Sequence, residues 1–132
     1  MAKQAIHTGN APEAIGAYSQ AIKVGQTVFI SGQLPLDPGT MNIVDGDIRA
    51  QTHRVFNNLA AIVREGGGNL DDVVKLTVFL TDLNHFAVVN EVMAEHFNPP
   101  YPARAAVGVA ALPKGAPIEI DAIVQILSLI HI

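Results

Sequence analysis

Residues 73–80, Val-Val-Lys-Leu-Thr-Val-Phe-Leu, restrict the possible folds most, because this strong β-strand pattern lies between two helical patterns. Before it, Asp47 is suited to cap a helix whose apolar residues recur at helical spacing until three consecutive glycines, 66–68, end it. After it, a second helical pattern covers about residues 83–97 and stops at Asn-Pro-Pro, 98–100. A strand enclosed by two helices in this way indicates a fold that mixes both kinds of element.

Three other segments have strand patterns. Residues 24–30 follow a turn signal, and the segments of about 103–112 and 118–126 surround a turn rich in proline and glycine at 113–117. The order of elements predicts an α+β fold with two helices on one face of a sheet. No repeat, linker or low-complexity tract divides the chain, so a single domain is expected.

The chain is poor in charge: 49% of its residues are hydrophobic and 15% are charged, against about a quarter charged in typical globular domains. A small domain has a large surface for its volume, and so few charged residues are not enough to cover that surface. We therefore expect part of it to be buried against other copies of the chain. The formal charge of −4 disfavours nucleic acid and anionic membranes, and the absence of cysteine excludes disulfides and thiol catalysis. Without a signal peptide or a bilayer-spanning apolar run, a soluble cytoplasmic protein is expected.

Two charged residues lie inside strand-like sequence, where a charge without a partner is unfavourable. Arg104 stands alone among small apolar residues, and Glu119 lies between Ile118 and Ile120. One interpretation is a buried ion pair of Arg104 with Glu119 or Asp121. The other is that Arg104 binds a substrate carboxylate, for which the planar guanidinium is well suited, while Glu119 positions a water or exchanges a proton.

Spacing does not show that the two charges meet. A simple hairpin centred near Gly115 would place Arg104 opposite roughly position 126, away from Glu119. A contact would need bulges, a connection other than a hairpin, or a second subunit. Alternation places Arg104 and Ala106 on one face of their strand, and we expect both small, apolar faces to be covered, one by helices and one by a neighbouring subunit.

The sequence gives little support for a metal site, a nucleotide-binding site or a serine hydrolase site. The five histidines lack the spacing of paired metal ligands. The glycines at 66–68 follow a predicted helix, whereas the glycine loop of a nucleotide-binding site precedes one. The Gly-x-Ser-x-Gly motif of serine hydrolases is absent. Tyr18, Ser31 and Asn90 are each unremarkable alone: a packing tyrosine, a turn serine, and an amide beside an apolar helix face that must find a hydrogen bond.

Together, these residues belong to motifs that resemble those of the Rid (YjgF) family of reactive-intermediate deaminases, most closely the RidA branch. The likeness runs from about Ile6 to Ile126. The motifs are Asn10-Ala11-Pro12-x-Ala14-Ile15-Gly16-x-Tyr18-Ser19-Gln20-Ala21, Ser31-Gly32-Gln33-Leu34-Pro35, Phe86-Ala87-x-Val89-Asn90, Pro102-Ala103-Arg104, Leu112-Pro113-Lys114-Gly115 and Ile118-Glu119-Ile120.

The resemblance implies a chorismate-mutase-like mixed sheet, assembled as a homotrimer with ligand clefts between subunits. It implies hydrolysis of 2-aminoacrylate, 2-iminopropanoate and 2-iminobutanoate to 2-keto acids and ammonia, without cofactor or metal. By position, Arg104 would hold the substrate carboxylate and Glu119 would orient the attacking water. Tyr18, Ser31 and Asn90 would line the cleft, with backbone groups near Gly32 and Ala106 assisting.

The chain departs from the family pattern in several places. Ala17 replaces a common proline, Ala106 replaces a frequent cysteine, and Met93 and His96 occupy positions that are more often aromatic. Residues 127–132 match nothing in the family and look like a translated sequencing adapter, so we hypothesise a non-native tail after a domain of residues 1–126. Alternative functions are a non-catalytic module that binds small carboxylates and, less favoured by charge and aromatic content, a ribonuclease or translation inhibitor.

Overall fold

The structure is a computed structural model that describes residues 2–127. Its central feature is one six-stranded sheet with the strand order β1-β2-β3-β6-β4-β5. The strands are β1 (Gln4–Ile6), β2 (Ala21–Val24), β3 (Thr27–Gln33), β4 (Val73–Leu80), β5 (Ala103–Gly108) and β6 (Ile118–Gln125). The helices are α1 (Ile48–Glu65) and α2 (Phe86–His96), with short 3-10 helices at Leu70–Asp72, Leu83–His85 and Pro113–Gly115. The predicted tail lies outside the described residues except for Leu127.

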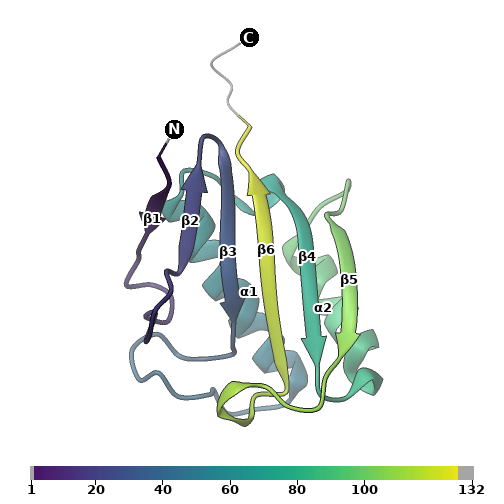
Figure 1. Ribbon diagram of the computed structural model, residues 1–132. Helices are drawn as coiled ribbons and strands as arrows, with labels where there is room; N and C mark the ends of the chain where they lie inside the picture. Colours follow the sequence, from purple (N-terminus) through teal and green to yellow (C-terminus); the bar gives the residue numbers. More distant parts are fainter. Residues whose placement is uncertain (1, 128–132) are drawn as a thin grey trace.

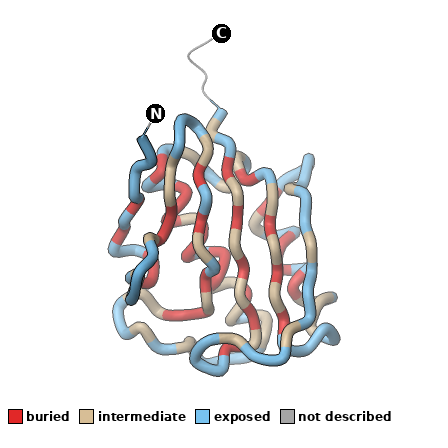
Figure 2. The backbone as a smooth tube through the Cα atoms, in the orientation of Figure 1, coloured by how far each residue is buried: buried red, intermediate tan, exposed pale blue. Residues whose placement is uncertain are grey.

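Both helices cover the same face of the sheet, as the sequence predicted (Figure 1). Helix α1 begins where Asp47 accepts a hydrogen bond from the backbone N–H of Ala50 (3.0 Å), and it ends before Gly66. Alternate residues of β6 and β4 point toward the helices and are buried, whereas the residues between them are partly exposed (Figure 2). The core therefore lies between the sheet and the helices.

The topology corrects the predicted arrangement of the last two strands. Strand β5 pairs with β4 in parallel, and β6 lies between β3 and β4, antiparallel to both. The two strands are therefore not a hairpin, because β4 separates them. Strand β5 ends at Gly108, four residues earlier than predicted, and the short strands β1 and β2 were not predicted.

The face of the sheet opposite the helices is open and carries both apolar and charged side chains, Glu119 among them. Phe29 of β3 and Val107 of β5, with 48% and 40% of their surfaces exposed, lie on it. Most of the edge strand β5 is exposed in the single chain, including Arg104 on the side of the helices, and cover by a neighbouring subunit stays a prediction. Among residues 2–127, no helix is long and apolar enough to cross a membrane.

Candidate active site

The structure places six of the seven predicted site residues in two cavities. Tyr18, Ser31, Gly32 and Glu119 line a first cavity of about 540 Å³, and Asn90 and Arg104 line a second of about 380 Å³. Ala106 lies on β5 beside Val78 and is not among the described residues that line either cavity.

A β-bulge shapes the first cavity. Between the pairs Ile30–Ala122 and Gln33–Ile120, two residues of β3 lie opposite one residue of β6, so Ser31 and Gly32 form the bulge. The backbone N–H of Ser31 donates to the carbonyl of Gln20 (3.0 Å), and its hydroxyl donates to the carbonyl of Ser19 (2.6 Å). The bulge is thereby tied to the segment that carries Tyr18.

Gly32 lies directly against the Glu119 carboxylate. A Cβ atom added to Gly32 would lie 2.7 Å from Oε2 and 2.8 Å from Cδ of Glu119, closer than real Cβ contacts allow. A glycine at this position therefore lets the carboxylate approach the β3 backbone. The sequence pattern did not predict this steric role.

The surroundings of Glu119 make its ionised form unfavourable. Partial burial, and secondarily the charge of Asp121, raise the pKa of Glu119 above its usual value. Among residues 2–127, no cation lies within 4 Å of this carboxylate. A carboxylate with a raised pKa in a cavity is suited to exchange a proton or to orient a water.

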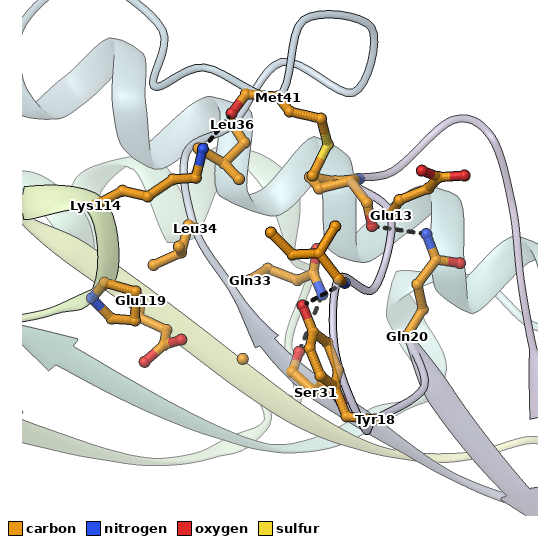
Figure 3. A pocket seen from close by; sticks show the side chains of 14 residues that line it. Glu13, Tyr18, Gln20, Ser31, Gln33, Leu34, Leu36, Met41, Lys114 and Glu119 are labelled. Atoms are coloured by element: carbon orange, nitrogen blue, oxygen red, sulfur yellow. Dashed lines mark hydrogen bonds between the residues drawn. The ribbon is translucent and has the colours of Figure 1, made fainter.

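Tyr18 stands at the wall of the same cavity, with 53% of its surface exposed. Its hydroxyl accepts a hydrogen bond from the backbone N–H of Ile15 (3.3 Å). Figure 3 shows the tyrosine ring beside Ser31, while Glu119 approaches from another side of the cavity.

Two buried glutamines in the wall of this cavity were not predicted as site residues. Gln20 is fully engaged, donating to the carbonyls of Thr8 and Pro12 and accepting from the N–H of Thr8. Gln33 donates to the carbonyl of Ser31 (3.1 Å), and its Oε1 has no partner among the described residues. Both occur in the quoted motifs, which is the only signal that the sequence offered for them.

The second cavity presents a guanidinium group held from one side. Arg104 Nη1 donates to Asn90 Oδ1 (2.8 Å) and lies 3.4 Å from the sulfur of Met93. The guanidinium carbon lies 4.7 Å from the centre of the Phe86 ring, within range of a cation–π interaction. All three partners come from α2, so this helix orients the arginine.

Arg104 has no carboxylate oxygen within 4 Å in the part of the chain that the structure describes. The alternative of a structural ion pair with Glu119 or Asp121 is therefore wrong within one chain. Arg104 is exposed, and hydrogen bonds to Asn90 leave most of its five N–H donors available to a ligand.

Within one chain, Arg104 and Glu119 face opposite sides of the sheet. Arg104 pairs with Leu76 of β4, whose buried side chain faces the helices, whereas Glu119 pairs with Phe79, which points to the open face. A small substrate cannot reach both groups in a single subunit. The sequence spacing did not show whether Arg104 and Glu119 meet, and the structure shows no contact between them within one chain.

Among residues 2–127, no group of three or more histidine, aspartate or glutamate side chains is arranged to hold a metal ion. The fold and the two cavities define a class: small α+β proteins with an exposed arginine and a carboxylate placed in separate cavities. Residues 8–126 match the model of the family described as Endoribonuclease L-PSP. The chain belongs to this family, which is also named the Rid family.

Individual relatives are similar over nearly their whole length. A RutC family protein of Pyrococcus abyssi is 56% identical over 123 residues, which cover 93% of this chain and 97% of the relative. A 2-iminobutanoate/2-iminopropanoate deaminase of Dermatophagoides farinae is 46% identical over 124 residues, covering 94% and 97%. The crystal structure of RidA from the Antarctic bacterium Psychrobacter sp. has a TM-score of 0.90 at 57% identity, covering 93% and 99%.

Proposed function

We propose that this protein hydrolyses small 2-imino acids and their enamine tautomers, such as 2-aminoacrylate, to 2-keto acids and ammonia without a cofactor. The observation that carries the proposal is the exposed Arg104 guanidinium, which has no carboxylate partner within the described residues and is oriented by Asn90 and Phe86. A deaminase relative at 46% identity supports the same reaction.

The proposed chemistry requires positioning more than a strong base. Arg104 binds the substrate carboxylate through two parallel hydrogen bonds. Glu119 orients a water whose oxygen bonds to C2 of the protonated imine, and it accepts the proton that the water loses. The proton passes to the amine nitrogen, and the C–N bond breaks while the hydroxyl proton on C2 passes to Glu119. Ammonia and the 2-keto acid leave, and Glu119 releases its proton to water. The protonated imine is already electrophilic, so holding water and carbon together supplies much of the rate.

The proposed site forms between subunits of a homotrimer in the cytoplasm. Each chain offers an Arg104 cavity on one side of its sheet and a Glu119 cavity on the other, so a neighbouring subunit has to bring the second group. The open face of the sheet, on which Phe29 and Val107 are exposed, offers a surface for that contact.

The reaction is tested by adding the protein to a threonine dehydratase and following the release of 2-ketobutanoate. The wild-type protein should accelerate the release, and Arg104→Ala should abolish the gain. Arg64→Ala is the matched control, because Arg64 is an exposed arginine near the end of α1. Equal rates for wild type and Arg104→Ala would refute the role of the guanidinium.

The shared site is tested by mixing two inactive variants, Arg104→Ala and Glu119→Gln, and letting subunits exchange. In a cyclic trimer, random mixing should restore about a quarter of the wild-type activity, because about three-quarters of the trimers are mixed and each has one intact site of three. A site within one chain would leave the mixture inactive.

The same assays decide between the alternatives. Binding of 2-ketobutanoate through Arg104 without turnover would favour a regulatory carboxylate-binding module. The family description includes an endoribonuclease, but the net charge of −4 and 5% aromatic residues are unfavourable for RNA binding. Salt-dependent retardation of a single-stranded RNA would support that alternative instead.

A further inference from the structure

The thioether of Met93 touches the guanidinium group that is proposed to bind substrate. Its sulfur lies 3.4 Å from Arg104 Nη1, the nitrogen that also donates to Asn90 Oδ1. The Met93 side chain is 4% exposed and belongs to the lining of the second cavity. The Met93 sulfur therefore lies beside the guanidinium at the wall of the cavity in which the substrate is proposed to bind.

The sulfur atoms of this chain are few, which makes the contact specific. The chain has no cysteine and three methionines. Of the two in the described residues, Met41 lines the first cavity, and Met93 alone has its sulfur within hydrogen-bonding distance of an arginine. A thioether is a weak hydrogen-bond acceptor, so in its reduced form Met93 leaves the cation available to an anion.

We propose that Met93 is an oxidative modification site, at which conversion of the thioether to the sulfoxide blocks anion binding by Arg104. The oxidant is a hydroperoxide: its O–O bond breaks, one oxygen bonds to the sulfur, the sulfur loses two electrons, and water or an alcohol leaves. The inference rests on the proposed function, in which Arg104 receives the substrate carboxylate.

The physical basis is competition for one set of donors. A sulfoxide oxygen is a strong acceptor, and its hydrogen bond to a guanidinium is assisted by charge. Placed beside Nη1, it occupies a donor that the substrate carboxylate needs. The modification is reversible, because methionine sulfoxide reductases return the thioether. The cavity would then lose and regain its affinity for carboxylates with the oxidation state of one atom.

The test compares wild type, Met93→Leu and Met41→Leu before and after treatment with hydrogen peroxide. Leucine has a volume similar to that of methionine and cannot be oxidised in this way. Each sample is analysed by peptide mass for the oxygen gained, by calorimetry for the Kd of 2-ketobutanoate, by kinetics for KM and kcat, and by thermal unfolding. Each variant is compared with its own untreated sample.

We expect oxidation to raise Kd and KM at least about tenfold in wild type and in Met41→Leu, since a charge-assisted hydrogen bond is lost. Met93→Leu should keep its affinity, and a sulfoxide reductase should restore that of wild type. An equal loss in Met93→Leu, an unchanged Kd with Met93 oxidised, or a loss explained by unfolding would each overturn the proposal. Binding of 2-ketobutanoate can be measured without turnover. If the protein bound this ligand but hydrolysed no imine, the proposed function would be refuted, and the effect of Met93 oxidation on anion binding could still be determined.

Discussion

Substitution of Gly32 by alanine tests whether the position of the Glu119 carboxylate controls the rate. The added Cβ would lie 2.7 Å from Oε2, whereas ordinary van der Waals contact begins at 3.4 Å, so the carboxylate has to retreat by at least about 0.7 Å. The atoms that clash are the end of a flexible side chain, so the fold can adapt by moving that side chain.

Displacement of a catalytic group by about 1 Å can cost on the order of 100-fold in rate. We therefore expect Gly32→Ala to lower kcat by about 10- to 100-fold while the free energy of unfolding falls by less than about 1 kcal/mol. The KM should change little, because in the proposed mechanism the substrate carboxylate is bound by Arg104, which lines the other cavity.

The coupled dehydratase assay gives kcat and KM, and denaturant unfolding gives the stability. Gly9→Ala is the matched control, since a Cβ added at Gly9 meets no atom within 4 Å. If Gly32→Ala retained wild-type kcat with Glu119 intact, the position of that carboxylate would not limit the reaction. A loss of activity that followed a loss of folded protein would equally contradict the reasoning.

Three further predictions concern pH. Partial burial and Asp121 raise the pKa of Glu119 in the folded protein. Ionised Glu119 therefore destabilises the fold at a pH above this raised pKa, and the effect vanishes at a pH below the ordinary pKa of a glutamate. Urea unfolding should show Glu119→Gln to be more stable than wild type at pH 7 to 8 but not near pH 4. In the same way, Asp121→Asn should lower the pKa of Glu119 and move the acid limb of kcat to lower pH. Burial, and secondarily His53, lower the pKa of His96 in the folded protein. The fold therefore keeps its full stability above about pH 6.5, where His96 is neutral, and loses free energy of unfolding as the pH falls and His96 is protonated. His96→Phe should reduce that loss between pH 7 and 5, and an unchanged dependence of the unfolding free energy on pH would contradict the prediction.

Local sequence signals predicted the elements in which propensity and burial agree. Strand β4 has the predicted bounds, and α1 begins at Asp47 and ends before Gly66 as the capping pattern indicated. Strands β1 and β2 were missed because three or four residues carry too little periodicity to register. Pairing between strands was missed for another reason: a parallel connection through α2 places β5 beside β4, and spacing in sequence does not encode that choice.

The site could be predicted only as a set of residues. Their identities came from motifs, but the division into two cavities depends on which face of the sheet each side chain occupies. The bulge at Ser31 and Gly32 interrupts the regular alternation of faces along β3, which sequence spacing does not reveal. The contact between Met93 and Arg104 and the close approach of Gly32 to Glu119 are also products of packing. Spacing alone indicated neither.

The separation of Arg104 from Glu119 has a physical consequence for the proposed enzyme. A guanidinium and a carboxylate in one cavity would pair with each other, which would occupy the donors that a substrate needs and lower the pKa of the acid. Strand β4 prevents this within a chain by holding the arginine toward α2 and the carboxylate toward the open face. Arg104 is then held by weaker partners, an amide and an aromatic ring, while partial burial and Asp121 raise the pKa of Glu119. Because neither group is bound to an opposite charge within the chain, both are available to the anionic substrate and the water of the proposed reaction.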